Sequence, residues 1–241
     1  AFWPGPLTLI LPRHPEVAAA AAGGHASVGL RCPSHPVAQA LLKALAQVGV
    51  WGVAAPSANQ FGRVSPTTAQ HVQAEFGDEL LILDGGACQV GIESTIIDCT
   101  RGAPVLLRPG AITPAQVQAA CGLAVLLPDA VQAPAPKASG TLESHYAPRA
   151  CVRLMDAAAL QRTLDEWSGP NVAVWSRTVP ATAPAQVLLR QMPVDAALAA
   201  QQLFALLREL DALAVEQIWV ETPPDTPEWA GVRDRLQRAA A

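Results

Sequence analysis

Short apolar runs alternate with longer helical patterns along the first half of this chain. Runs with the length and β-branched content of strands fall at residues 7–11, 27–31, 52–55, 80–83, 95–99 and 105–107. The spacing of apolar positions predicts helices over residues 36–48, 66–76 and 114–121. Ser65 precedes a proline and is the predicted N-cap of the second helix. This alternation predicts an α/β fold built on a mixed sheet.

The pattern changes at residues 128–150, where prolines are interleaved with Ala, Ser and Gly. Such a composition predicts an extended linker. Beyond it, predicted strands at 152–155, 172–175 and 218–220 alternate with predicted helices at 156–167, 196–213 and 228–239. That order is typical of a small parallel-sheet domain. We therefore expect a domain over 1–127, a linker over 128–150 and a second domain over 151–241.

Composition supports a folded protein, because 51% of the 241 residues are hydrophobic and only 15% are charged. The formal net charge is −4, which disfavours non-specific binding to nucleic acid. No apolar run is long enough to span a bilayer and no signal-peptide pattern opens the chain, so we expect a cytoplasmic protein. The five cysteines form no C-x-x-C pair, which argues against structural zinc and predicts small core residues.

Several polar residues follow predicted strands, where α/β folds place their sites. Ala55 ends the run at 52–55, and Ser57 to Asn59 follow it. The hydroxyl and amide groups here suit a phosphate or a base, but the local sequence alone favours an ordinary turn. Ser65, at a predicted helix start, has the free N–H groups and dipole of that start nearby.

Two further stretches carry candidate binding residues. Ser94 directly precedes the run at 95–99, and Arg108 directly follows the run at 105–107 with a fork suited to an anion; a surface ion pair is the alternative for the arginine. In the linker, Tyr146 is the only tyrosine of the chain and directly follows His145. Such a pair in a connector favours stacking or hydrogen bonding over a site.

Other catalytic signatures are absent from the sequence. It contains no phosphate-binding loop with Lys-Ser/Thr, no G-x-G-x-x-G, no H-E-x-x-H and no G-x-S-x-G. The remaining histidines, His14, His25, His35 and His71, lack the spacing of metal ligands. The residues alone therefore indicate an α/β protein with an anion site.

Read in order, five blocks resemble one family. They are Phe2 to Thr8 (FWPGPLT), Ser27 to Pro33 (SVGLRCP), Pro56 to Thr68 (PSAN…SPTT), Gly91 to Asp98 (GIESTIID), and Leu107 to Gly110 (LRPG). The stretch from Gly140 to Pro148 is similar to that family's interdomain linker. The family is the YrdC-type L-threonylcarbamoyladenylate synthases in their two-domain form, and residues 151–241 resemble its C-terminal domain in pattern.

The resemblance implies a YrdC-like twisted mixed sheet with helices, followed by a smaller Rossmann-like α/β domain. It implies that L-threonine, bicarbonate and ATP give threonylcarbamoyl-AMP and pyrophosphate, for a separate transferase that modifies tRNA to N6-threonylcarbamoyladenosine. The implied ATP-binding residues are Ser27, Ser57, Asn59, Ser65, Arg108, His145 and Tyr146. The implied threonine-binding residues are Arg31, Ala55 and Ser94. Mg²⁺ is expected on the phosphates, with no protein nucleophile and no carboxylate pair indicated as its ligands.

The family's Lys-x-Arg pair lies upstream of the FWPGPLT block and is not in this chain. We therefore expect a missing N-terminal segment and little or no activity from the 241 residues alone. Three alternatives remain open from sequence: a carbamoyl-adenylating protein of the hydrogenase-maturation type, an RNA-binding module and an inactive relative. The first usually carries cysteine-rich zinc modules, which this chain lacks, and the second is disfavoured by the charge.

Overall fold

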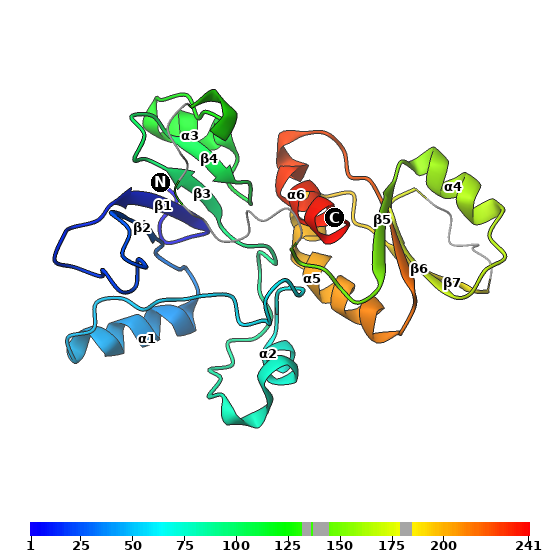
Figure 1. The fold of residues 1–241 in the computed structure, drawn as a ribbon, viewed down its shortest axis with the longest axis horizontal. Coiled ribbons are helices and arrows are strands. Elements are labelled where there is room, and N and C mark those ends of the chain that lie inside the picture. The colour runs from blue at the N-terminus through cyan, green and yellow to red at the C-terminus, as the bar shows by residue number, and fades with distance from the viewer. Residues whose placement is uncertain (132–135, 137–144, 179–184) are drawn as a thin grey trace. The chain divides into compact units, whose positions relative to one another are not determined.

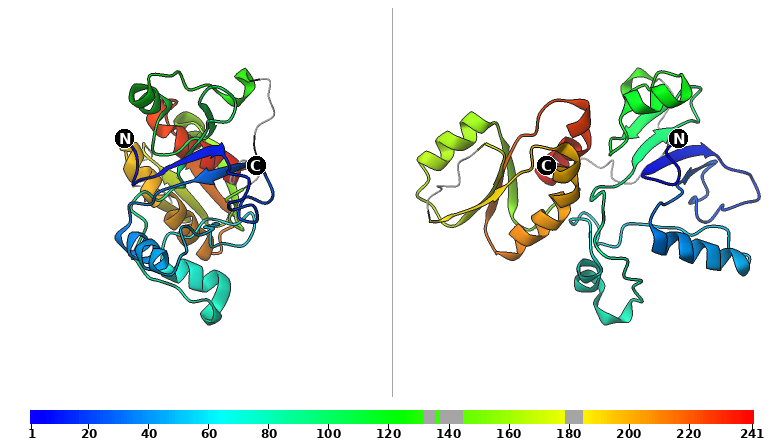
Figure 2. Two further views of the ribbon diagram at one scale, coloured as in Figure 1. Left: turned by 90° about the vertical axis from the view of Figure 1, so that its left-hand side faces the viewer. Right: turned by 180° about the vertical axis from the view of Figure 1, so that it is seen from behind.

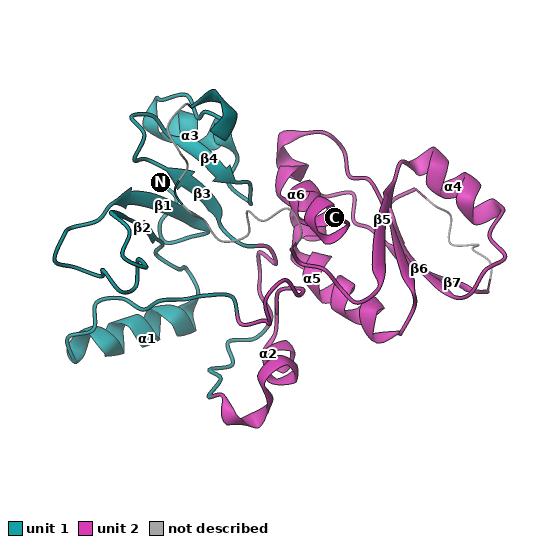
Figure 3. Ribbon diagram, in the orientation of Figure 1, with its two compact units in different colours: residues 1–57, 81–86, 93–141 teal, residues 58–80, 87–92, 142–241 magenta. Residues whose placement is uncertain are grey.

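The computed structural model describes residues 1–131, 136, 145–178 and 185–241. The chain forms two compact units, each built from separated segments (Figure 3). Unit 1 comprises residues 1–57, 81–86 and 93–141, and unit 2 comprises residues 58–80, 87–92 and 142–241. The backbone therefore passes from one unit to the other five times.

Unit 1 is organised on a four-stranded mixed sheet (Figure 1). Its strands are β1 (Leu7–Pro12), β2 (Ser27–Leu30), β3 (Thr95–Asp98) and β4 (Val105–Arg108), in the order β2-β1-β3-β4. Strand β1 runs antiparallel to β2 and parallel to β3, and β3 runs antiparallel to β4. The predicted mixed sheet is confirmed.

The two helices of unit 1 differ in how they pack. Helix α3 (Pro114–Cys121) begins with a capping box and a proline in its first turn, and it buries Val117 against strands β1, β3 and β4. Helix α1 (Pro36–Gln47) is capped by His35 and buries none of its residues.

Unit 2 contains a second four-stranded sheet, and every pairing in it is parallel. Its strands are β5 (Cys151–Met155), β6 (Val172–Ser176), β7 (Val187–Gln191) and β8 (Gln217–Glu221), in the order β5-β8-β6-β7. Helix α4 (Ala157–Asp165) covers one face, and helices α5 (Ala196–Ala212) and α6 (Ala230–Ala239) cover the other (Figures 1 and 2). The predicted parallel-sheet domain is confirmed, although β7 was not predicted.

Segments from the first half of the sequence complete unit 2. Helix α2 (Ala69–Phe76) belongs to it, together with the loop before that helix and residues 87–92. Val64 and Ile92 pack in the same apolar cluster as α5. Gly91 lies so close to the backbone of α5 that a Cβ there would overlap Gln201. The described residues of the two units also form the short 3-10 turns η1 (Gly77–Glu79), η2 (Pro128–Ala130) and η3 (Pro227–Trp229).

Two predicted strands do not form. Residues 52–55 and 80–83 join neither sheet, and among the described residues no strand pairs with either. Their apolar side chains are consequently exposed, as at Val53 and Leu81. A ladder needs a partner for its backbone groups, so β-propensity alone does not make a strand.

Two local predictions were also wrong. Ser65 does not cap helix α2, because Thr68 does so, accepting from the His71 amide at 3.2 Å and starting the helix one turn later than expected. The cysteines are not core residues, since Cys32 is half-buried and the other four are exposed. Cys99, Cys121 and Cys151 lie at the ends of elements rather than in their buried middles. Within the described residues, no helix is long and apolar enough to cross a membrane.

Candidate functional site

Three strands of unit 1 bring polar side chains to one edge of the sheet. The parallel pairing of β1 with β3 aligns Leu7 with Thr95, and the antiparallel pairing of β3 with β4 aligns Ile96 with Arg108. The starts of β1 and β3 therefore lie beside the end of β4. There, the hydroxyls of Thr8 and Ser94 are 2.7 Å apart.

Arg108 is fixed against the same serine. Its Nε and Nη2 atoms donate to the Ser94 carbonyl at 3.1 and 3.0 Å, and Nη2 lies 3.3 Å from the Ser94 hydroxyl. Only 6% of the arginine is exposed. A planar guanidinium with two donors on one carbonyl has little freedom to reorient, so the edge carries a preorganised positive charge.

The chain after β4 is locked to the start of β3. The Thr95 hydroxyl donates to the Ile112 carbonyl at 2.8 Å and accepts from the Ile112 amide at 3.0 Å. Between them, Gly110 packs so tightly that a Cβ would lie 2.5 Å from the Thr95 nitrogen. The glycine of the LRPG block is thus required by close backbone approach, and it sets where Arg108 and Ser94 meet.

Strand β2 places the two predicted residues of its block at opposite ends. Arg31 directly follows Leu30, which pairs with Leu9, so it lies at the edge that holds Thr8. It is exposed, and its guanidinium forms no hydrogen bond or ion pair with any described residue. Ser27 pairs with Pro12 at the far end, about 13 Å away at the usual rise of a strand. Ala55 and Ser57 lie in an exposed segment of unit 1.

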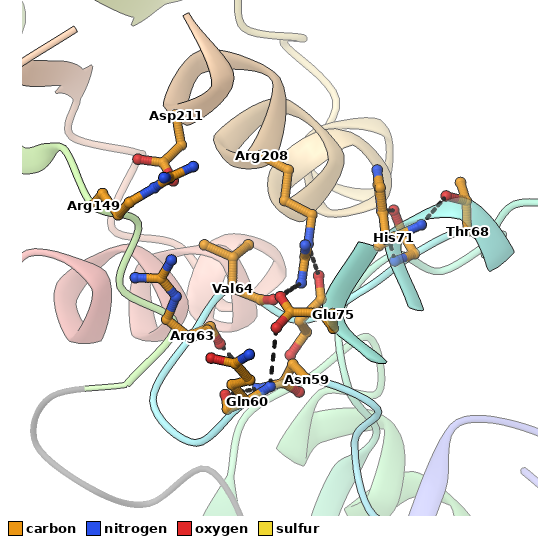
Figure 4. A network of polar contacts seen from close by, with 12 residues as sticks. Asn59, Gln60, Arg63, Val64, Thr68, His71, Glu75, Arg149, Arg208 and Asp211 are labelled. Carbon is orange, nitrogen blue, oxygen red and sulfur yellow. Dashed lines mark hydrogen bonds and ion pairs between the residues drawn. The ribbon is translucent and has the colours of Figure 1, made fainter. Parts of the chain in front are cut away.

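Asn59 and Ser65 belong to unit 2, in the loop that leads to α2. The Asn59 amide is used within this loop, donating to the carbonyls of Gln60 and Arg63 at 2.8 and 3.1 Å. Ser65 is 5% exposed, and its carbonyl accepts from Arg208 of α5 at 3.3 Å. Figure 4 shows this loop together with the side chains that hold it.

His145 and Tyr146 also belong to unit 2. The Tyr146 ring is fully buried, 5.1 Å from the ring of Phe204 and 4.1 Å from that of His145. The Arg235 guanidinium lies 5.7 Å from the centre of the tyrosine ring. Tyr146 has a φ of 65°, a left-handed conformation that is uncommon for a bulky residue and sits where the linker enters the core.

A groove of about 530 Å³ opens beside the loop of unit 2. Its walls include His71 and Glu75 of α2, Arg149 at the end of the linker, and Arg208 and Asp211 of α5 (Figure 4). Burial lowers the pKa of His71, and the neighbouring Arg208 charge lowers it further. The Arg149 Nε lies 3.4 Å from Asp211, so opposite charges alternate along this wall.

Comparison with known proteins places these units in one family. A family model described as telomere recombination matches residues 1–110, and one described as the C-terminal domain of threonylcarbamoyl-AMP synthase matches residues 112–241. The chain is 35% identical to threonylcarbamoyl-AMP synthase of Bacillus subtilis, over 99% of its own length and 70% of the relative's. The chain belongs to the threonylcarbamoyl-AMP synthase family.

Other members of the threonylcarbamoyl-AMP synthase family are similar to this chain in sequence and in structure. The Pyrococcus abyssi synthase is 34% identical over 99% of this chain and 71% of its own. A crystal structure of P. abyssi Sua5 complexed with L-threonine superposes with a TM-score of 0.80 at 31% identity, covering 99% of this chain and 71% of that one. A P. abyssi Sua5 variant with adjacent His and Tyr replaced by alanine gives a TM-score of 0.78 at 30% identity, with 99% and 70% coverage.

In this member of the threonylcarbamoyl-AMP synthase family, three residues that contact the candidate site residues, or the loop that carries them, were not predicted from the sequence. Thr8 appeared in the sequence analysis only as the end of the FWPGPLT block, although a threonine next to the start of a predicted strand is a usable signal. Arg208 and Glu75 gave no signal, because charged residues on helices are most often solvated. The described residues contain no group of three or more His, Cys, Asp or Glu that could hold a metal ion.

Proposed function

We propose that this chain forms L-threonylcarbamoyl-AMP and pyrophosphate from L-threonine, bicarbonate and ATP. The observation that carries the proposal is the likeness over 99% of the chain to P. abyssi Sua5 complexed with L-threonine. Relatives named threonylcarbamoyl-AMP synthase from B. subtilis and P. abyssi support the same reaction.

The chemistry needs no nucleophile from the protein. The threonine amine attacks the carbon of bicarbonate and water leaves, which gives a carbamate. A carbamate oxygen then attacks the α-phosphorus of ATP, and the bond from that phosphorus to the leaving pyrophosphate oxygen breaks. Both steps join anionic reactants, so positioning and fixed positive charge are what the protein contributes.

We assign the residues to two substrates by resemblance to the family. Those assigned to ATP are Ser27, Ser57, Asn59, Ser65, Arg108, His145 and Tyr146. Those assigned to threonine are Arg31, Ala55 and Ser94. Two observations support the assignment of the arginines: Arg108 is buried and held by Ser94, and Arg31 is exposed and makes no contact with a charged side chain among the described residues. A held guanidinium suits developing phosphate charge, and an exposed one suits the threonine carboxylate.

The linker pair has separate support. The P. abyssi variant carries alanines in place of an adjacent His and Tyr. In this chain the single tyrosine, Tyr146, directly follows His145, so only this position offers such a pair. Because the Tyr146 ring packs within unit 2, we propose that the pair anchors the end of the linker and that His145, half-buried, faces the nucleotide.

The surroundings of the reaction follow from the same proposal. Mg²⁺ enters bound to the ATP phosphates, because phosphates of the substrate are its usual ligands in ATP-using enzymes. We propose residues 1–127 as the synthase domain, 128–150 as the linker and 151–241 as the smaller domain, with residues 58–80 and 87–92 of the first belonging to the same compact unit as residues 142–241. The product passes to a tRNA-modifying transferase, and the reaction takes place in the cytoplasm.

The test follows ¹³C-bicarbonate into threonylcarbamoyl-AMP by mass spectrometry, with ATP, Mg²⁺ and L-threonine. It is run on the chain and on the chain with any residues that its gene encodes ahead of Ala1 restored. We expect labelled product that requires threonine. Arg108→Lys, which keeps the charge but loses the fork, should lower the rate about 100-fold, the usual effect of removing one preorganised donor.

The control is Arg153→Ala, because Arg153 is exposed on β5 of unit 2 and its guanidinium forms no hydrogen bond or ion pair with a described residue. Its rate should match that of the parent. Arg31→Ala should raise the KM for threonine at least tenfold while leaving the KM for ATP unchanged. Absence of labelled product from both forms of the chain would contradict the proposed reaction.

A further inference from the structure

Arg208 of helix α5 holds the loop that carries Asn59 and Ser65. Its guanidinium donates to the carbonyls of Val64 and Ser65, the latter at 3.3 Å. The Nη2 atom, which donates to the Val64 carbonyl, also donates to Glu75 of α2 at 2.7 Å. One side chain from the C-terminal half of the sequence therefore ties together the end of the loop and the helix that follows it (Figure 4).

Glu75 extends this connection to the start of the loop. Its second oxygen accepts from the Gln60 amide at 3.3 Å, so the carboxylate links Arg208 to the residue next to Asn59. The side chains of Arg208 and Glu75 are only 16% and 11% exposed. A pair this shielded from water is screened less than a surface pair, so its geometry is held more firmly.

Other contacts show that the loop is a part of unit 2. The Ala147 amide donates to the Gly62 carbonyl at 2.9 Å, which joins the loop to the end of the linker. Val64 packs in the apolar cluster that includes Leu207 of α5. The family model for the first half of the chain spans residues 1–110, yet residues 58–80 pack with the second half.

We propose that Arg208 is a positioning residue for nucleotide binding, acting through the loop of residues 59–65 without touching ATP. The proposal rests on the proposed function, because that function assigns Asn59 and Ser65 to ATP. It gives the C-terminal domain a specific task in the reaction. Without Arg208, the Val64 and Ser65 carbonyls lose their donor and Glu75 loses its counter-charge, so the loop no longer has one preferred arrangement.

The variant is Arg208→Met, which keeps the length and apolar stem of the side chain but removes all donors. The matched control is Arg190→Met. Arg190 of β7 forms an ion pair at 2.7 Å with Glu209, which lies next to Arg208 on α5. The Arg190 side chain is 42% exposed and forms no hydrogen bond or ion pair with the loop. Calorimetry measures the Kd of each protein for ATP·Mg and for L-threonine. Amide hydrogen exchange, followed by mass spectrometry, reports on residues 58–67.

We expect Arg208→Met to weaken ATP binding at least tenfold, to leave threonine binding within twofold and to speed exchange in residues 58–67. Arg190→Met should change none of these. Glu75→Gln should have a smaller effect than Arg208→Met, because the amide oxygen still accepts from Arg208 and the two carbonyl contacts remain. A merely structural arginine would lower thermal stability while ATP affinity stayed at the parent value, and that result would overturn the proposal.

The same measurements separate this proposal from the proposed function. A parent chain that binds ATP but forms no threonylcarbamoyl-AMP, with binding weakened by Arg208→Met, would contradict the reaction and support the positioning role. A parent that forms product, with ATP affinity unchanged by Arg208→Met, would overturn only the positioning role. A parent that binds no ATP, with or without residues restored ahead of Ala1, would overturn both.

Discussion

The two sheets of this protein have the same number of strands but very different interiors. On one face of the parallel sheet of unit 2, 22 buried residues form a continuous apolar cluster, whereas the apolar cluster of unit 1 has four buried members. Polar and charged groups form a larger share of the buried residues in unit 1, which buries Ser94, Thr95, Asp98 and Arg108 beside this small cluster. Unit 2 buries Ser65, Thr67, Ser176, Glu221 and Arg235 among many more apolar residues. Its helix α1 buries no residue, while α5 buries seven.

This difference separates stability from chemistry. A buried polar group costs free energy unless it is hydrogen-bonded, so a sheet edge rich in such groups is a poor source of stability and a good place for a site. A parallel sheet whose two faces are covered by helices buries mostly apolar side chains, so it contributes stability and offers few polar groups for a site. We therefore expect substitutions in unit 2 to act mainly on unfolding, and substitutions at the edge of unit 1 to act mainly on the reaction.

The largest expected effect tests the apolar interiors. Leu207→Ala removes a fully buried side chain from α5 and should lower the free energy of unfolding by about 3–5 kcal/mol. Leu106→Ala, at a position 9% exposed in β4, should cost about 2 kcal/mol, since the smaller cluster leaves a less enclosed space. Urea unfolding followed by far-UV circular dichroism measures both. A larger loss of unfolding free energy for Leu106→Ala than for Leu207→Ala would contradict the idea that unit 2 has the more stabilising interior.

The next effect concerns the one strongly hydrogen-bonded carboxylate of the unit 2 sheet. Glu221, at the end of β8, is 1% exposed and accepts from Ser176 Oγ at 2.5 Å, from Thr178 N at 3.0 Å and from Arg177 Nη2 at 2.6 Å. Glu221→Gln should lower the free energy of unfolding by about 2–3 kcal/mol at pH 7, as expected for bonds to a charged group.

The stabilisation by Glu221 should depend on pH, in a direction set by its pKa. Burial alone would raise the pKa of Glu221, but the bonds from Ser176, Thr178 and Arg177 outweigh burial and hold it below its usual 4.5. A lowered folded-state pKa stabilises the fold above about pH 4.5, and that stability is lost as the pH falls through the folded value. The gap between parent and Glu221→Gln should therefore narrow below pH 4.5, and a constant gap down to pH 2 would contradict the assignment.

A smaller effect on stability, with a larger one on activity, is expected at Gly110. A Cβ there would meet the Thr95 backbone and hydroxyl at 2.5 and 2.8 Å, so Gly110→Ala should cost about 1–3 kcal/mol by overpacking. Because the strain falls between Arg108 and Ser94, synthesis should drop at least tenfold in protein that is still folded. Gly52→Ala is the control, since nothing lies within 4 Å of its added carbon, and it should change stability by less than about 0.5 kcal/mol.

The smallest effect sharpens the comparison within unit 1. Thr113 caps α3, and its hydroxyl accepts from the Gln116 amide at 3.3 Å while Gln116 accepts from the Thr113 amide at 2.8 Å. Thr113→Ala should cost about 1 kcal/mol, and Thr113→Ser should restore most of it. Thermal unfolding measures both. Equal losses for the alanine and serine variants would show that the hydroxyl does not hold the helix start.

Much of this fold follows from the sequence because most elements carry local signals. Runs with the length and β-branched content of strands predicted β1 and β3, and the spacing of apolar positions predicted α3. The failures are non-local: residues 52–55 have strand composition but no partner, and Thr68 rather than Ser65 caps α2 because the chain from Val64 to Thr67 is held by other segments. The sequence identified Ser94 and Arg108 as members of two separate motif blocks. It did not predict that they touch, because that contact depends on the register of β3 with β4.

The contact between Arg208 and Glu75 joins residues 133 positions apart, and this has a consequence for synthesis on the ribosome. At roughly 5–20 residues per second, Glu75 is added to the chain about 7–27 seconds before its partner. Throughout that interval the loop before α2 lacks the arginine that fixes it in the finished protein. A nascent chain arrested before residue 208 should therefore be cut by a protease in residues 58–80, and the cut should disappear once α5 has been released from the exit tunnel.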